Sequence, residues 1–190
     1  MKSFTIVVTL LWAFSATVVA QEASLGPRDK ALIQGAFDGE LAKVQAVLAK
    51  GASLEATGPK GRTAVIWAAA NGHTSVVEFL HRQGADIKAK DSNDQTALMF
   101  AVKGSYAETV KYLLENGADV NARSIKQGFT PLTIAAAVGD VNVVRLLLDH
   151  GADKNIAERD GNTALDRARQ YGHPEVVALL GGEVEVDSSS

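Results

Sequence analysis

The 190-residue sequence contains no cysteine, which excludes disulfide bonds, thiolate nucleophiles and cysteine-ligated zinc sites. Aromatic residues make up only 6% of the chain, whereas alanine, leucine and valine are abundant, and small apolar side chains suit close packing between helices. The charge is close to balanced, with a formal net charge of −3 and a pI near 5.8. Such a chain has no strong electrostatic attraction to phosphate, so we do not expect nucleic acid as its partner.

The first twenty residues have the organisation of a secretory signal peptide. A positive charge at Lys2 precedes the largely apolar residues 4–14, and Val18 and Ala20 stand at the −3 and −1 positions of a cleavage site before Gln21. The alternative is an uncleaved membrane anchor, because the stretch approaches the roughly 17–25 residues of a membrane span. Polar residues interrupt it, which favours cleavage and predicts a periplasmic or secreted protein that does not contact the membrane afterwards.

A period of 33 or 34 residues runs through the rest of the chain. Two independent markers keep this period, a Gly-Ala pair and a threonine that opens the following segment. The pairs begin at Gly51, Gly84, Gly117 and Gly151, and the threonines are Thr63, Thr96, Thr130 and Thr163. Repeats with such a period cannot bury their apolar faces alone and must stack on one another.

Each period contains the pattern of two helices. In the second unit, Thr63 can cap a short helix with its hydroxyl group, and residues 71–73 (NGH) interrupt that helix. Residues 74–82 then place apolar side chains on one helical face, and Gly84 ends the second helix. A polar stretch leads to the next unit, which predicts helix pairs joined by hairpin loops.

These residues resemble the ankyrin repeat family, most clearly in "GRTAVIWAAANGHTSVVEFLHRQGADIKAKD" and "GFTPLTIAAAVGDVNVVRLLLDHGADKN". The resemblance implies an all-α ankyrin-repeat solenoid of about five stacked helix-turn-helix units with hairpin loops. We expect a signal peptide over 1–20, a linker over 21–27, an ankyrin repeat domain over 28–182 and an acidic, serine-ended tail over 183–190. The expected units are 28–57, 58–90, 91–123, 124–157 and 158–182.

Two features depart from the regular pattern. The first unit keeps only the later half of the repeat motif, which indicates an N-terminal cap. Residues 104–106 read GSY where the neighbouring units read NGH and YGH. The loop between Gly117 and Thr130 is one residue longer than its counterparts. Neutral drift and a reshaped binding surface are both open interpretations, and drift is favoured.

No constellation in the sequence indicates catalysis, so we expect no enzyme, no cofactor and no metal site. The four histidines, His73, His81, His150 and His173, lack zinc-type spacing, and His73 and His173 are expected to make structural hydrogen bonds within their loops. Aspartates that follow the Gly-Ala pairs are expected to form turns. Nothing supplies the nucleophile, base and oxyanion donors of a catalytic site.

The resemblance implies that a partner protein contacts the concave side, which the hairpin tips and first helices form. Phe129 is of particular interest, because an exposed aromatic side chain in a polar loop can anchor an interface; folding back onto a neighbouring tip is the alternative. Trp67 and Phe100 are expected to pack between units. The candidate contact residues, carried over by repeat position, are Lys60, Arg62, Ala70, Asn71, Asn93, Gln95, Met99, Lys103, Lys126, Gln127, Phe129, Val138, Arg159, Asn162, Gln170 and Tyr171.

The leading hypothesis is an exported protein-binding module, of bacterial origin, that is monomeric when free. It would bind and inhibit or mask a periplasmic or secreted enzyme such as a cell-wall hydrolase. One alternative is an accessory factor that stabilises an exported enzyme, for example one used in oxidative defence. Another is a secreted effector directed at a host cell.

Overall fold

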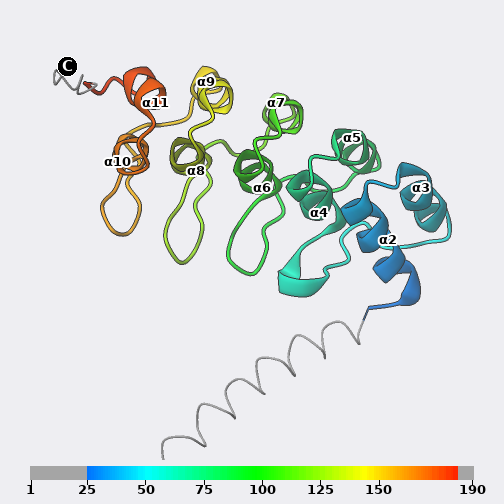
Figure 1. Ribbon diagram of the computed structural model, residues 1–190. Coiled ribbons are helices and arrows are strands. Elements are labelled where there is room, and N and C mark those ends of the chain that lie inside the picture. The colour runs from blue at the N-terminus through cyan, green and yellow to red at the C-terminus, as the bar shows by residue number, and fades with distance from the viewer. Residues whose placement is uncertain (1–24, 184–190) are drawn as a thin grey trace, which may run out of the picture.

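The computed structural model describes residues 25–183, and within this range the chain folds into five helix pairs that stand side by side (Figure 1). The predicted signal peptide and most of the predicted linker and tail lie outside the described residues. None of the described helices is long and apolar enough to span a membrane. In chain order the pairs are α2 (Pro27–Asp38) with α3 (Leu41–Ala49), α4 (Ala64–Ala70) with α5 (Thr74–Arg82), α6 (Ala97–Lys103) with α7 (Ala107–Glu115), α8 (Pro131–Val138) with α9 (Val141–Asp149), and α10 (Ala164–Gln170) with α11 (Pro174–Leu179).

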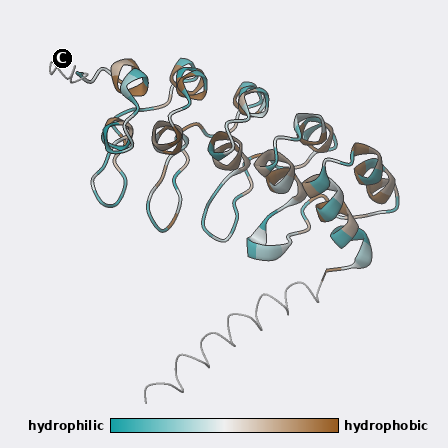
Figure 2. Ribbon diagram, viewed as in Figure 1, coloured by the Kyte–Doolittle hydropathy of each residue, from teal (hydrophilic) through white to brown (hydrophobic). Residues whose placement is uncertain are grey.

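The helices form two layers, and the loops between repeats extend away from them (Figure 1). First helices pack on the first helices of neighbouring repeats, and second helices pack on second helices. The loops project from the first-helix layer, on the side opposite the second helices, and are mostly hydrophilic (Figure 2). A short 3-10 turn, η1 (Pro59–Gly61), forms the tip of the first of them. This arrangement confirms the predicted helical repeat solenoid.

The layers can approach closely because each of repeats two to five places an alanine near the centre of its first helix. Ala68, Ala101, Ala135 and Ala168 each follow the repeat threonine by five residues, and all four are fully buried. The second helices contribute the larger side chains of the core, such as Leu80, Leu113 and Leu147, also with no exposed surface. A single hydrophobic core therefore runs through all repeats, as stacking requires.

The first repeat is a complete helix pair, as the prediction of five helix-turn-helix units requires, although its residues match the repeat motif only in the later half. Its first helix, α2, has twelve residues and begins with Pro27 at a position where proline is tolerated. This helix lacks the threonine marker, but it buries Leu32, Ile33 and Ala36 on one face. The apolar face of α2 therefore packs on the stack without following the motif of the other repeats.

Threonine caps three of the four marked helices. The hydroxyl oxygens of Thr96, Thr130 and Thr163 accept hydrogen bonds from the backbone N–H three residues later. The backbone N–H groups of Thr130 and Thr163 in turn donate to the side chains of Thr133 and Asp166, three residues later. Each of these two helices therefore begins with a capping box. The prediction is wrong for Thr63, whose buried Oγ1 has no hydrogen-bond partner within the described residues.

The two loop histidines form hydrogen bonds with the preceding repeat. The prediction that they bond within their own loops is therefore wrong. The Nε2 atom of His73 lies 3.0 Å from the carbonyl oxygen of Phe37, and that of His173 lies 3.1 Å from the carbonyl oxygen of Ala137. The His173 ring lies against Gly139, where φ is +85° and a Cβ atom would come within 2.4 Å of its Nδ1. Glycine is therefore required at this close approach.

The departure at residues 104–106 preserves the same contact with different atoms. Tyr106 takes the place of the histidine and lies against Gly72, where a Cβ atom would come within 2.4 Å of its ring. Ser105 adopts the positive φ of 56° that glycine adopts at the equivalent position of the other loops. The change is thus accommodated in the loop between the two helices of the repeat, where the Tyr106 ring packs on Gly72 and stays 36% exposed.

Candidate protein-binding surface

Neighbouring hairpin tips are joined by backbone hydrogen bonds. The amide of Ser92 donates to the carbonyl of Lys60 over 2.8 Å, and Ile125 donates to Asn93 over 2.9 Å. Arg159 donates to Gln127 over 2.9 Å, so the four tips form one connected rim. We call the surface formed by this rim and the first helices of repeats two to five the hairpin face.

The extra residue in the loop between Gly117 and Thr130 is absorbed at the tip. The Ser124 amide donates to the carbonyl of Phe129, and the Ser124 hydroxyl accepts from the Phe129 amide over 3.0 Å. Ile125 is left 48% exposed at the outer end. The longer loop therefore holds the Phe129 backbone by two hydrogen bonds with Ser124, one donated and one accepted by the serine.

Arg62 fills the hairpin face between repeats two and three. Its guanidinium lies 4.7 Å from the ring centroid of Trp67 and 4.2 Å from that of Phe100. Its Nε also donates to Asp91 over 3.3 Å, and only 14% of its side chain is exposed. Arg62 was predicted to contact a partner, but its charged group is already engaged inside the stack, which places Trp67 and Phe100 between units as expected.

Between repeats three and five the hairpin face is open. A groove of about 370 Å³ is lined by residues from the loops and from α6, α8 and α10. Val138 and Tyr171 at its edge are 40% and 56% exposed, while Phe129 is half-buried and faces the groove. The lining residues are Gln95, Lys103, Phe129, Thr133, Ile134, Ala137, Val138, Glu158, Arg167 and Tyr171, of which Gln95, Lys103, Phe129, Val138 and Tyr171 were predicted from the sequence.

A buried ion pair closes one wall of this groove. The Arg167 guanidinium donates to both carboxylate oxygens of Glu158 and, over 2.7 Å, to Asp160, and it lies 5.9 Å from the Phe129 ring centroid. Hydrogen bonds from Arg167 to Glu158 raise the pKa of this guanidinium, whereas backbone hydrogen bonding from Asn162 lowers the pKa of Asp160. Arg167 therefore stays charged and fixed, with 13% of its side chain exposed.

The other predicted contact residues lie on the same face, with one exception. Met99 is 1% exposed because its side chain points into the core, so its prediction as a surface contact is wrong. Ile134 and Arg167 also face the groove but were not among the predicted contacts; each stands four residues after a repeat threonine. Helical spacing could have found Ile134, because residues four apart share a face and Val138 was chosen. The half-buried predicted residues are Ala70, Asn71, Asn93 and Asn162, and the exposed ones are Lys60, Lys126, Gln127, Arg159 and Gln170.

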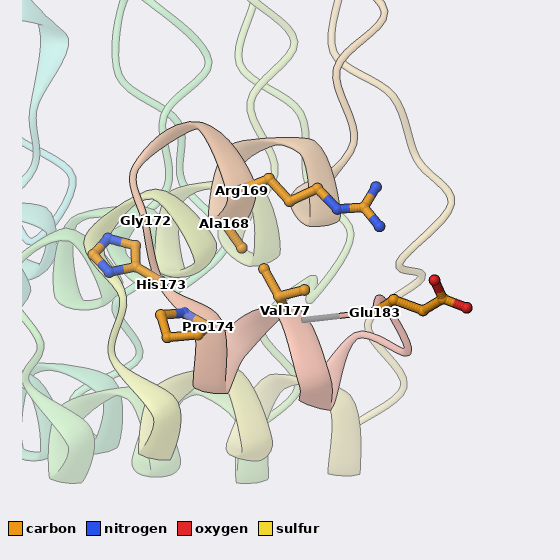
Figure 3. Close-up of a pocket in the computed structure, with 7 residues that line it drawn as sticks. All are labelled: Ala168, Arg169, Gly172, His173, Pro174, Val177 and Glu183. Carbon is orange, nitrogen blue, oxygen red and sulfur yellow. The ribbon is translucent and has the colours of Figure 1, made fainter. Parts of the chain in front are cut away.

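A second hollow lies at the C-terminal end of the stack, where α10 and α11 have no following repeat within the described residues. It has a volume of about 550 Å³ and an apolar floor that includes Ala168 and Val177, with Arg169 and Glu183 at its edge (Figure 3). The hollow is therefore the open end of the core rather than part of the hairpin face.

Within residues 25–183, no group of three or more histidine, aspartate and glutamate side chains is arranged to hold a metal ion. The charged residues that line the groove are Lys103, Glu158 and Arg167. Arg167 is paired with both Glu158 and Asp160, so this cluster carries a net charge of −1. The site offers apolar contact surface and fixed charges, which are the means of macromolecular recognition.

Comparison with known proteins agrees with this architecture. The family described as "Ankyrin repeats (3 copies)" matches residues 32–124 and 123–189. The chain is 51% identical over 51 residues to E3 ubiquitin-protein ligase XBAT33 of Arabidopsis thaliana, which covers 27% of this chain and 10% of the ligase. It is 39% identical over 59 residues to Dauer abnormal formation protein 25 of Caenorhabditis elegans, covering 31% of this chain and 15% of that protein.

A third relative is Ankyrin repeat domain-containing protein 63 of Homo sapiens, 42% identical over 59 residues, with 29% of this chain and 16% of the relative covered. The chain therefore spans less than a fifth of the length of these relatives, all of which are eukaryotic. The likeness concerns the repeats alone. Because the family match extends over nearly all of the described residues, the chain belongs to the ankyrin repeat family, whose stacked repeats are protein-interaction modules.

Proposed function

We propose that this protein is a binding module that seats a partner protein on its hairpin face, with the groove between repeats three and five at the centre of the contact. The observation that carries the proposal is the exposure of Val138 and Tyr171 beside Phe129 and Ile134 in that groove. A cluster of apolar side chains within a polar rim is typical of the centre of an interface. The connected hairpin tips hold this surface in place before a partner arrives, which lowers the entropic cost of binding.

The N-terminal sequence supports a further part of the proposal, that the protein acts outside the cytoplasm. The apolar residues 4–14 and the small residues up to Ala20 fit a secretory signal. In that compartment the module would inhibit or mask an enzyme, such as a cell-wall hydrolase, by covering its active-site opening. The absence of cysteine is compatible with an oxidising compartment.

Export and binding are tested separately. For export, the full-length chain is expressed in a bacterium, the cells are fractionated, and the intact mass of the protein is measured. Loss of residues 1–20 in the periplasmic or secreted fraction is the expected result. Retention of the full mass in the membrane fraction would favour the uncleaved anchor instead.

For binding, a photo-crosslinking amino acid is placed at position 138 or 171 in the groove, and as a control at position 111 or 145 on the exposed side of α7 or α9. A partner should be captured from the groove positions and not from the controls. Equal capture from both faces would contradict the proposed surface. The activity of the captured enzyme is then measured with and without this protein; a lower activity supports masking, and a higher one supports the stabilising alternative.

A further inference from the structure

Charge is distributed unevenly between the two sides of the molecule. The hairpin loops and first helices of repeats two to five, residues 58–70, 88–103, 121–138 and 156–170, carry ten lysines and arginines and five aspartates and glutamates. The rest of residues 25–183 carries eight and fourteen, respectively. The hairpin face is thus basic although the chain as a whole is acidic.

Much of this positive charge is available to a partner. Three of the five acidic residues, Asp91, Glu158 and Asp160, are already paired with Arg62 or Arg167. Among the described residues, the exposed lysines of the face, such as Lys103 and Lys126, form no ion pair. Lys103 also lines the groove directly, so an apolar hollow and a free cation adjoin each other.

The groove itself selects for size and polarity. Its volume of about 370 Å³ lies near the lower end of the range of ligand pockets, roughly 300–1,000 Å³, and suits one or two large side chains rather than a folded domain. Ile134, Ala137 and Val138 supply apolar surface, and Phe129 and Tyr171 supply aromatic rings. An aromatic or large aliphatic side chain would displace water from the groove, and the burial of its apolar surface would favour binding.

We propose that the groove receives an acidic segment of the partner protein that carries a large apolar side chain between carboxylates. The apolar side chain enters between α8 and α10, and the flanking carboxylates lie against Lys103 and the basic hairpin tips. Charge complementarity steers such a segment to this face and sets its orientation. This inference rests on the proposed protein-binding function and specifies the chemistry of the partner.

The experiment uses the full-length protein and four synthetic nine-residue peptides. Two are acidic and two are lysine-rich, and each pair has either phenylalanine or alanine at the centre. Binding is followed up to millimolar peptide by NMR of the methyl groups of Ile134, Ala137 and Val138. We expect the acidic phenylalanine peptide to bind about tenfold more tightly than the acidic alanine peptide, the ratio expected from burial of one large apolar side chain.

Matched variants locate the binding. Lys103→Glu should weaken the binding of the acidic phenylalanine peptide about fivefold at low salt, and added salt should reduce this difference in affinity. Val138→Glu should abolish the shifts. Arg145→Glu on exposed α9 makes the same charge change as Lys103→Glu and should leave the affinity unchanged. Circular dichroism melts of each variant verify that it is folded.

Equal binding of the lysine-rich phenylalanine peptide, or the absence of any binding at millimolar concentration, would overturn the inference. So would single-stranded DNA that binds more tightly than the peptide and shifts the same methyl groups, because the basic face would then be a nucleic-acid surface. A partner crosslinked at positions 138 and 171 while the acidic peptide fails to bind would leave the proposed function intact and refute only the acidic segment.

Discussion

Replacing Arg62 with alanine should lower the free energy of unfolding by about 3 kcal/mol. The substitution removes two ring contacts, at 4.7 and 4.2 Å, each worth roughly 0.5–1 kcal/mol at partly exposed sites. It also leaves Asp91, whose side chain is fully buried, without its cation, and breaking a buried pair costs roughly 3–5 kcal/mol. The amides of Asn93 and Gln95, which donate to Asp91 over 2.8 and 3.0 Å, offset part of that cost.

The loss can be measured by urea denaturation followed by circular dichroism, with the slope of the transition checked for constancy. Arg62→Lys keeps the charge but not the flat group that stacks between Trp67 and Phe100, so it should recover less than half of the loss. In a double-mutant cycle with Asp91→Asn, the two substitutions should be strongly non-additive. A loss below about 1 kcal/mol for Arg62→Ala would refute the view that this stack stabilises the contact between repeats two and three.

Two further predictions concern the helix caps, and both are checked by urea denaturation. Thr63→Val should stabilise the protein by roughly 1 kcal/mol because it removes a buried hydroxyl that has no hydrogen-bond partner. Thr130→Val should destabilise it by about 1–2 kcal/mol because it breaks a capping box. A change in stability of the same sign for both variants would contradict this assignment. Hydrogen bonds from Thr163 lower the pKa of Asp166, so the stability that this cap contributes is present above about pH 4 and is lost as the pH falls through the folded pKa. Asp166→Asn should reduce the loss of stability between pH 6 and pH 3, and an unchanged loss would exclude this carboxylate as its source.

The hairpin face is filled at one end and open at the other, and this unevenness matters for recognition. Arg62 occupies the space between repeats two and three, where it joins Trp67 to Phe100. Between repeats four and five the Arg167 side chain is drawn towards Glu158 and Asp160, and the space beside Phe129 stays open. A partner therefore meets a closed, stabilised region next to a groove that can accept a side chain.

The sequence by itself determined the repeat and the helix pairs, and its resemblance to ankyrin repeats indicated the side of the molecule on which the candidate residues lie. A marker that recurs every 33 or 34 residues reports the spacing of whole structural units, and each unit needs the next one to bury its apolar face. Helical periodicity and capping chemistry act within a few residues, so they can be recognised in the chain directly. In the first repeat these signals are weaker, because α2 buries its apolar face without the shared motif.

Only the tertiary structure decided which of these residues are free to bind. Arg62 and Phe129 both stand immediately before a repeat threonine, yet Arg62 is enclosed by two rings and Phe129 borders an open groove. The difference comes from the residue four positions after the threonine of the next repeat, which is Phe100 for Arg62 and the ion-paired Arg167 for Phe129. These contacts join residues in different repeats, and their outcome depends on distance and competing partners in three dimensions, which the pattern of one repeat does not contain.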